Sequence, residues 1–355
     1  MATLAKTIPM HKILFLLFIT FTSVLNAQIG GKYTYEFLGL PSSARETALG
    51  GSLITVVDDD VNLARSNPAL LSSETNKSLA FNHNFLFDGI SNGFVNYGFS
   101  AFGINAHAGI TYANYGDFIA ADVFGNRNGT FSASEVAIHL GASKKLNEGI
   151  TVGANIKGIN STLESYSSIG IAADLGLLYH KPGANYQFAI SIKNLGTELS
   201  TFTENRQEAP LDIQIAYSKK LTHLPFRFTI TAHQLQQWDI RYDDPDALEE
   251  TDLFGETSEE SELEKEVDNL FRHLIFSGEF LLGRSQNLRL RIGYNHFRRQ
   301  ELSVSDFRSL SGFSLGFGIK VNRFRLDYGV GYHHLAGGAN HLTISTNLER
   351  FGKKL

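Results

Sequence analysis

The stretch Phe102-Gly-Ile-Asn-Ala-His-Ala-Gly-Ile-Thr-Tyr112 alternates apolar side chains with polar or small ones without a break. Side chains of a β-strand point to opposite faces with a period of two, so Ile104 and Ile110 share one face, and Asn105 and His107 share the other. One face then meets an apolar medium and the other a polar one. In bacterial outer-membrane barrels, about ten such residues cross the hydrocarbon layer at a tilt. The pattern therefore predicts an all-β membrane protein.

Similar alternation recurs along the rest of the chain, and the connections between the alternating stretches are short and long in turn. Such barrels have an even number of strands, with short periplasmic turns and longer outer loops. We therefore predict a 14-stranded antiparallel outer-membrane β-barrel with both termini in the periplasm. The predicted strands are 77–87, 91–100, 102–113, 132–143, 149–159, 167–180, 185–194, 211–220, 225–235, 274–283, 287–297, 311–320, 323–333 and 340–350. The expected outer loops are 114–131, 160–166, 195–210, 236–273, 298–310 and 334–339, with one short outer hairpin around Asp88-Gly89.

The first 27 residues have the features of a secretory signal peptide. Lys6 and Lys12 precede the apolar run Ile13–Leu25, and the small Ala27 offers a cleavage point. A helix that spans a bilayer needs roughly 20 apolar residues, more than this run contains. We therefore predict secretion of the mature chain across the inner membrane.

Composition narrows the class of protein further. The chain contains no Cys, which excludes a lipid-anchored N-terminus and a disulfide framework. Without residues 1–27, 29 basic residues face 36 acidic ones, and the resulting net charge of −7 disfavours nucleic-acid binding. The 33 Gly and 27 Phe suit a barrel with curved strands and aromatic girdles.

Residues 28–76 precede the alternating stretches and lack their period. Ser43-Ala-Arg-Glu46 fits a capping box at the start of a short helix, and Leu53–Val57 reads as a short apolar strand. Asn67-Pro68 fits a helix start, with a capping residue before a Pro. We predict that residues 28–76 form a plug or lid of the barrel, which itself comprises residues 77–355.

The longest predicted outer loop, 236–273, is strongly acidic. From Asp239 to Asp268 it carries fourteen Asp or Glu residues against only two basic ones, a composition typical of a solvated loop. However, Ser261-Glu-Leu-Glu264 fits a capping box, and apolar residues follow at helical spacing. We predict an amphipathic helix whose apolar face contacts the rim or a partner, through Leu263, Val267, Leu270 and Phe271.

Charges of both signs fall on the inward faces of the predicted strands. They are Lys157, Asp174, Lys193, Glu279, Arg289, Arg291, Arg325 and Asp327. A selective pore carries a ring of one sign, whereas mixed charges in a narrow lumen are expected to pair. We predict that Arg45 and the run Asp58, Asp59 and Asp60 of the plug pair with lumen residues such as Arg289, Arg291 and Asp327.

Candidate catalytic and metal-binding residues have simpler interpretations. Gly312-Phe-Ser-Leu-Gly316 matches the Gly-x-Ser-x-Gly nucleophile pattern, but Ser314 lies inside an alternating strand rather than at a strand–turn–helix elbow. His333, His334 and His341 flank one loop without the spacing of a structural zinc site. The Asp58–Asp60 run lacks the spaced ligands of a calcium loop. We expect no catalytic residue, metal or cofactor.

Several motifs resemble a known family. Phe37-Leu-Gly-Leu-Pro-Ser-Ser-Ala-Arg-Glu-Thr-Ala-Leu-Gly-Gly51, Asn67-Pro-Ala-Leu-Leu71, Leu288-Arg-Leu-Arg-Ile-Gly-Tyr-Asn295 and Arg298-Arg-Gln-Glu-Leu302 are similar to segments of outer-membrane proteins from bacteria of the Bacteroidetes type. That family is related to the FadL fatty-acid transporters, and some members serve the type IX secretion system. The resemblance covers essentially the whole mature chain. It implies a 14-stranded FadL-like barrel with an N-terminal plug and no enzymatic activity.

The resemblance also implies a partner. The barrel would lie in the lipid and lipopolysaccharide environment of the outer membrane and dock a surface protein resembling PorZ. Through it the barrel would serve an attachment complex in which the sortase PorU, held by PorV, joins cargo to lipopolysaccharide. A FadL-like channel for hydrophobic small molecules is the alternative, and it would need an apolar pocket near the plug. A hydrolase using Ser314 is the third hypothesis.

Overall fold

A computed structural model describes residues 33–202, 206–241, 261–302, 310–334 and 337–352. The predicted signal peptide, the start of the predicted plug at residues 28–32, and residues 242–260 of the acidic loop lie outside these residues. None of the helices in the described part of the chain has the length and apolarity needed to cross a membrane.

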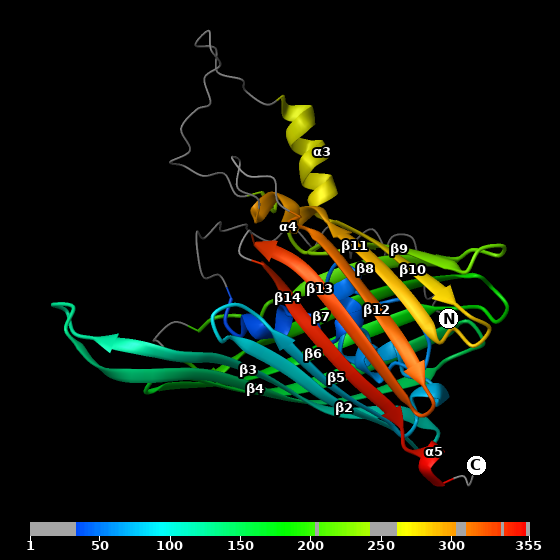
Figure 1. The fold of residues 1–355 in the computed structure, drawn as a ribbon, viewed down its shortest axis with the longest axis horizontal. Helices are drawn as coiled ribbons and strands as arrows, with labels where there is room; N and C mark the ends of the chain where they lie inside the picture. The colour runs from blue at the N-terminus through cyan, green and yellow to red at the C-terminus, as the bar shows by residue number, and fades with distance from the viewer. Residues whose placement is uncertain (1–32, 203–205, 242–260, 303–309, 335–336, 353–355) are drawn as a thin grey trace, which may run out of the picture. The chain divides into compact units, whose positions relative to one another are not determined.

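Fourteen antiparallel strands form one closed barrel in which each strand pairs with its neighbours in the sequence (Figure 1). β1 also pairs with β14, with Ser78 opposite Asn347, and this pairing closes the ring. The fold-class prediction is therefore confirmed. The strands are β1 (Ser78–Phe85), β2 (Ser91–Ala101), β3 (Ile104–Ala121), β4 (Arg127–Lys145), β5 (Ile150–Leu163), β6 (Tyr166–Tyr179), β7 (Tyr186–Ser200), β8 (Asp212–Lys220), β9 (Phe226–Ala232), β10 (Leu274–Leu282), β11 (Leu288–Asn295), β12 (Phe313–Val321), β13 (Phe324–His334) and β14 (Gly337–Asn347).

The two faces of the barrel wall follow the predicted alternation. On β4, Ile138 and Leu140 are exposed on the outer surface, while His139 between them is buried. On β5, Ile156 is exposed, while Lys157 beside it is buried. Because a slip of one residue would exchange the two faces, this exposure pattern agrees with the register read from the sequence.

The hairpin of β3 and β4 differs from the expectation of a loop at 114–131. Both strands continue beyond their neighbours, and Asp117–Ala121 pairs with residues of the stretch Arg127–Ser132 (Figure 1). The ladder shifts register between Asn114 and Asp117, and then resumes. Phe118 stacks on Phe131 with ring centroids 5.2 Å apart, so cross-strand aromatic contact supports a ribbon that the short-range alternation did not reveal.

Two other expected loops are also shorter than predicted. β7 continues to Ser200 into the expected loop 195–210, and β5 and β6 leave only two residues of the expected loop 160–166 unpaired. The expected loop 298–310 begins inside the helix α4 (His296–Glu301), which Asn295 caps by accepting the Arg298 N–H. Strand pairing thus extends further on the loop side than the polar composition of these segments suggested.

The segment before β1 consists of short helical turns inside the ring of strands (Figure 1). They are η1 (Glu36–Gly39), α2 (Ala44–Ala48), η2 (Val61–Arg65), η3 (Pro68–Leu70) and η4 (Ser73–Thr75). We call residues 33–76 the plug. α2 contacts β11 to β14, η3 contacts β4 to β6, and η2 contacts β1 and β2, so the plug touches the wall on several sides.

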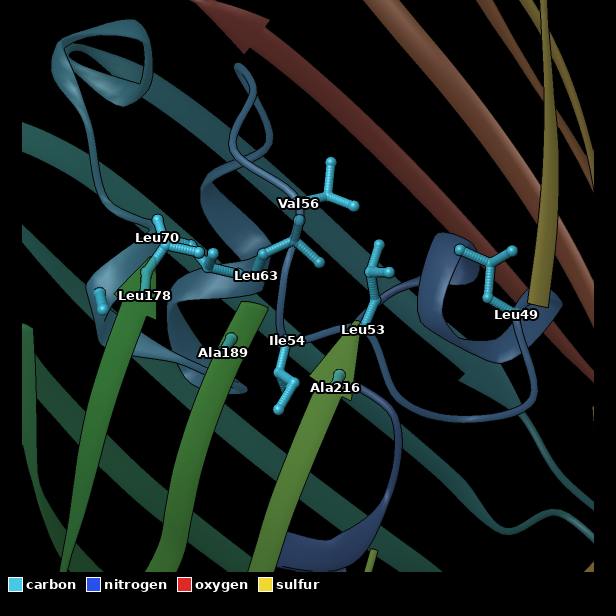
Figure 2. Packing of buried hydrophobic residues seen from close by; sticks show 10 residues of the cluster. Leu49, Leu53, Ile54, Val56, Leu63, Leu70, Leu178, Ala189 and Ala216 are labelled. Atoms are coloured by element: carbon cyan, nitrogen blue, oxygen red, sulfur yellow. The ribbon is translucent and has the colours of Figure 1, made fainter. Parts of the chain in front are cut away.

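Two local predictions for the plug need correction. Ser43 caps α2, but the Glu46 carboxylate accepts the N–H of Ser42 (2.8 Å) rather than that of Ser43, so only half of a capping box forms. The segment Leu53–Val57 is not a strand. Its apolar side chains serve a core instead, because Leu53, Ile54 and Val56 pack in one cluster with small wall residues (Figure 2). The helical start at Asn67-Pro68 forms as expected, with Asn67 accepting the Ala69 N–H.

Candidate functional site in the lumen and at the outer rim

Arg45 of α2 is the centre of an ion-pair network between the plug and the barrel wall. Its guanidinium is 1% exposed and donates to Asp58 at 2.8 Å and to Asp60 at 3.3 Å, both within the plug. It also donates twice to Glu279 of β10, from Nε and Nη2 at 3.0 Å each. A bidentate arginine–carboxylate contact fixes orientation as well as distance. Arg45 thus binds the plug to one side of the wall.

The aspartate run of the plug receives further cations from the wall. Arg289 of β11 lies 3.3 Å from Asp58, and Arg325 of β13 lies 2.7 Å from Asp59. Lys320 of β12 lies 3.0 Å from Asp59. Burial would raise the pKa of Asp58, but the nearby charges of Arg45 and Arg289 outweigh burial and hold that pKa well below its usual range.

Two wall residues extend the network to neighbouring strands. Arg291 of β11 lies 3.1 Å from Glu279 and 2.6 Å from Asp327, and Arg227 of β9 lies 3.0 Å from Glu279. We call this set the lumen ion cluster: Arg45, Arg227, Arg289, Arg291, Lys320 and Arg325 with Asp58, Asp59, Asp60, Glu279 and Asp327. The cluster contains six cations and five anions, so its net charge is small. A large net charge would be costly in a narrow interior that excludes most water.

The structure therefore brings together all eight residues selected for charge pairing, although some partners differ from those expected. Arg291 of β11 and Asp327 of β13 pair with each other on the inner face of the wall rather than with the plug. The sequence analysis did not select Arg227 and Lys320 as lumen charges. Alternation could have identified them as inward-facing, because Arg227 lies between Phe226 and Phe228, and Lys320 follows the outward-facing Ile319.

A second buried pair lies within the wall. Lys157 of β5 and Asp174 of β6 are 2.6 Å apart and almost fully buried. Asp174 also accepts the backbone N–H of Asn194 at 2.8 Å, at a register shift between β6 and β7. This pair stabilises the wall at the register shift. Among the described residues, neither partner forms an ion pair with the plug.

Neutral hydrogen bonds hold the plug backbone around the rest of the ring. Asn and Ser side chains of the wall donate to carbonyl groups of the plug, which would otherwise be buried without partners. These bonds run from Asn96 to Val61 (2.7 Å), Ser143 to Leu71 (2.9 Å), Asn155 to Ala64 (2.9 Å), Ser191 to Ser66 (2.7 Å) and Ser277 to Leu49 (2.8 Å). Five different strands supply these donors, so the plug is attached on all sides rather than hinged at one.

Glycines mark where the plug backbone lies directly on the wall. An added Cβ at Gly329 of β13 would lie 2.1 Å from the carbonyl oxygen of Ala44. One at Gly293 of β11 would lie 2.2 Å from the backbone nitrogen of Gly50. Any larger residue at either position would displace the plug.

Outside the barrel, the predicted amphipathic helix forms α3 (Glu262–Arg272), beginning at a full capping box of Ser261 and Glu264 (Figure 1). The four residues selected for partner binding lie along it at helical spacing, and all remain exposed. Their exposed fractions are 72% for Leu263, 45% for Val267, 45% for Leu270 and 43% for Phe271. Among the described residues, this is an apolar helix face left largely open to solvent.

An ion pair and a histidine–carboxylate contact hold the base of α3 to α4. Arg272 donates to Asp268 at 2.6 Å and to Glu301 of α4 at 2.5 Å. His296 at the start of α4 lies 3.0 Å from Asp268. The polar side of α3 is thus fixed to the rim. Of the apolar face, Phe271 also contacts His296 edge-on with ring centroids 5.9 Å apart, while Leu263, Val267 and Leu270 stay exposed.

The remaining sequence candidates lie apart from one another. Ser314 is buried within β12, with no strand–turn–helix elbow around it. His341 is buried and within hydrogen-bond distance of Thr47 of the plug (2.9 Å), while His333 and His334 lie at the end of β13. In the described ranges, no group of His, Asp and Glu could hold a metal ion.

Comparison with solved structures places the fold. The Pseudomonas putida toluene transporter TodX superposes with a TM-score of 0.51 at 11% identity, over 86% of this chain and 96% of TodX. A TodX deltaS2S3 mutant, a monoaromatic hydrocarbon channel, gives 0.50 at 13% identity, over 87% of this chain and 99% of the mutant. No family profile and no curated protein matches the sequence. The chain thus shares its closed 14-stranded barrel fold with TodX.

Proposed function

We propose that this protein is a plugged outer-membrane barrel that docks a surface protein, with a role similar to that of PorQ in the type IX secretion system. Its partner would resemble PorZ and, through PorZ, connect to PorU and PorV. The barrel would lie in the lipid and lipopolysaccharide of the outer membrane with both termini in the periplasm. The observation that carries this proposal is the exposed apolar face of α3, on a helix whose other side is fixed to the rim.

The composition of α3 suits a two-part binding mode. Acidic residues around the helix attract a basic partner over about 8 Å at physiological salt, which raises the association rate. Buried apolar anchors, by contrast, set the residence time of a complex. Leu263, Val267, Leu270 and Phe271 form one stripe that fits into a groove of a folded partner.

The filled lumen supports docking over transport. The plug bonds to many strands, and ion pairs and amide groups line its contact with the wall. A hydrophobic molecule that crossed this contact would have to separate paired charges. The plug is therefore a support for the outer rim in this proposal.

A channel for hydrophobic small molecules is the second candidate, supported by the likeness to TodX, which is described as a monoaromatic hydrocarbon channel. It requires that the plug move or that a path open through the wall. Uptake of toluene by liposomes that contain the protein, at a rate above that of empty liposomes, would favour this function.

Docking is tested by replacing the four apolar residues of α3 with Ser. We expect an inserted, heat-resistant barrel that no longer retains its surface partner on co-purification from gently extracted native membranes. The matched control replaces Glu262 and Glu266 of the same helix with Gln, which should slow association but keep the partner bound. Deletion of residues 245–268 should also release the partner into the medium. Normal retention by the Ser variant would refute docking through α3.

A further inference from the structure

A cavity of about 400 Å³ opens at the outer mouth of the barrel, above the plug. Its floor is the plug turn Gly50–Ser52. Its walls come from the residues that follow β9 and from the junctions of β7 with β8 and of β11 with α4. The size is within the range of small-molecule sites, and none of the residues proposed above for partner binding lines it.

Arg298 of α4 supplies a positive charge to this cavity. Its guanidinium lies over the plug, where an added Cβ at Gly51 would be 2.6 Å from Nη2. Burial lowers the pKa of Arg298 to about 10, which still leaves the group charged at neutral pH. No carboxylate in the described ranges lies within ion-pair distance of it. A partly buried arginine without a counterion is costly unless a ligand supplies the anion.

The other charges of the cavity limit the anion that fits. Lys193 adds a second cation, but its Nζ is 3.9 Å from Asp212, at the limit of an ion pair. Asp212 is further engaged, because it accepts the backbone N–H of Gln234 at 2.9 Å. Glu36 adds a second carboxylate to the lining. Asp212 offsets the charge of Lys193, so Arg298 is the cation of the lining with no carboxylate of the described residues beside it. One unbalanced cation suits a ligand with one negative charge and disfavours a dianion.

Polar neutral groups complete the lining. His233 is 6% exposed, and its Nε2 has no hydrogen-bond partner in the part of the chain that the structure describes. Burial lowers the pKa of His233 to about 4, so the ring is neutral and adds no charge. Gln214, Gln236 and Asn295 also line the cavity, and each already forms hydrogen bonds within the protein through both its oxygen and its nitrogen. An amide has a second N–H and a second lone pair, and these suit a hydroxyl or peptide group rather than hydrocarbon.

We propose that this mouth cavity binds the carboxylate of a small polar molecule, with Arg298 as the main anion-binding residue, Lys193 as the second cation, and the amides contacting its polar body. A sugar acid and the C-terminus of a short peptide share this chemistry. The bound molecule would touch the plug floor and α4 together, so the site connects the lumen to the outer rim.

The test is calorimetric titration of the full-length protein in detergent with charged and neutral probe pairs. One pair is glucuronate and glucose, and the other is N-acetyl-trialanine and its C-terminal amide. We expect at least one carboxylate to bind about tenfold or more tightly than its neutral counterpart, because a charge-assisted hydrogen bond is lost in the neutral probe. The pair that shows the difference identifies the source of the carboxylate. Equal binding within both pairs, or tighter binding of inorganic phosphate, would overturn the proposal.

Substitutions in the cavity test whether the carboxylate binds there. Arg298→Gln should weaken the preferred carboxylate about tenfold or more, Arg298→Lys should restore part of the affinity, and Lys193→Gln should weaken it less. Arg284→Gln, on an exposed turn outside the cavity, is the matched control and should bind as the unmodified protein does. Heat resistance of the barrel on gels verifies folding of each variant. Unchanged affinity in both folded Arg298→Gln and folded Lys193→Gln would overturn the assignment.

Discussion

Replacing Glu279 with Gln tests whether the lumen ion cluster holds the plug closed. The Glu279 carboxylate contacts Arg45 of the plug and Arg227 and Arg291 of the wall at 3.0–3.1 Å. In the variant, Arg45 keeps Asp58 and Asp60, and Arg291 keeps Asp327. Arg227 keeps no carboxylate partner among the described residues. The substitution thus removes the only ion pair between Arg45 and the described residues of the wall.

The expected cost follows from these remaining partners. Removing one partner of a buried pair costs about 3–5 kcal/mol. Since two of the three arginines keep another carboxylate, and Arg227 is 15% exposed, we expect about 3 kcal/mol, at the lower end of this range. A difference of 1.4 kcal/mol is tenfold in an equilibrium constant, so the displaced-plug population should rise by about a factor of 100.

Single-channel recording in planar bilayers measures this population as the fraction of time a conducting state is seen. The matched control is Lys157→Met, which breaks the equally buried pair with Asp174 inside the wall. It should lower the free energy of unfolding by a similar amount without adding conductance. Equal conductance of Glu279→Gln and the unmodified protein, or equal opening of the control, would refute the proposal that the ion cluster closes the lumen.

Three further changes test other parts of the structure. Gly329→Val should displace the plug and raise conductance, because its Cβ would lie 2.1 Å from the Ala44 carbonyl, whereas Gly158→Val, with open space around it, should not. Ile156→Arg on the outer face should lower the free energy of unfolding in liposomes by about 2–4 kcal/mol, and a negligible change would contradict the assigned register. Asp58 has a folded-state pKa below its unfolded value of about 3.9, so its stabilisation is present above that pH and is lost as pH falls through the folded pKa. Conductance of the unmodified protein should therefore stay low on acidification to about pH 4 and rise only below it, and opening near pH 6 would contradict this cause.

The positions and facing of the strands could be predicted from the sequence better than any other part of the fold. Ile138, Leu140 and Ile156 lie outward as alternation requires, because a membrane barrel imposes opposite media on its two faces. The α3 helix followed equally directly from the capping box at Ser261 and the apolar spacing after it. Both features depend on local order along the chain, which a sequence displays.

The errors fall where neighbours distant in sequence decide the structure. The apolar segment Leu53–Val57 resembles a strand, but its side chains fill a core with Leu178 and Ala189 of the wall. The expected loop 114–131 is instead part of an extended β-hairpin, in which Phe118 stacks on Phe131 of the facing strand. The plug–wall pairing of Arg45 with Glu279 was not predictable, since the sequence does not place the plug against β10.

The order of contacts around the plug has a consequence for how the chain assembles. The plug precedes β1, yet α2 contacts β11 to β14, which are the last strands of the chain. The plug can therefore form these contacts only after β11 to β14 have joined the barrel. Ala44, for instance, donates its N–H to Thr343 of β14, the strand that pairs with β1 to complete the ring. We therefore expect seating of the plug and closure of the β1–β14 seam to be late, mutually dependent steps of barrel biogenesis.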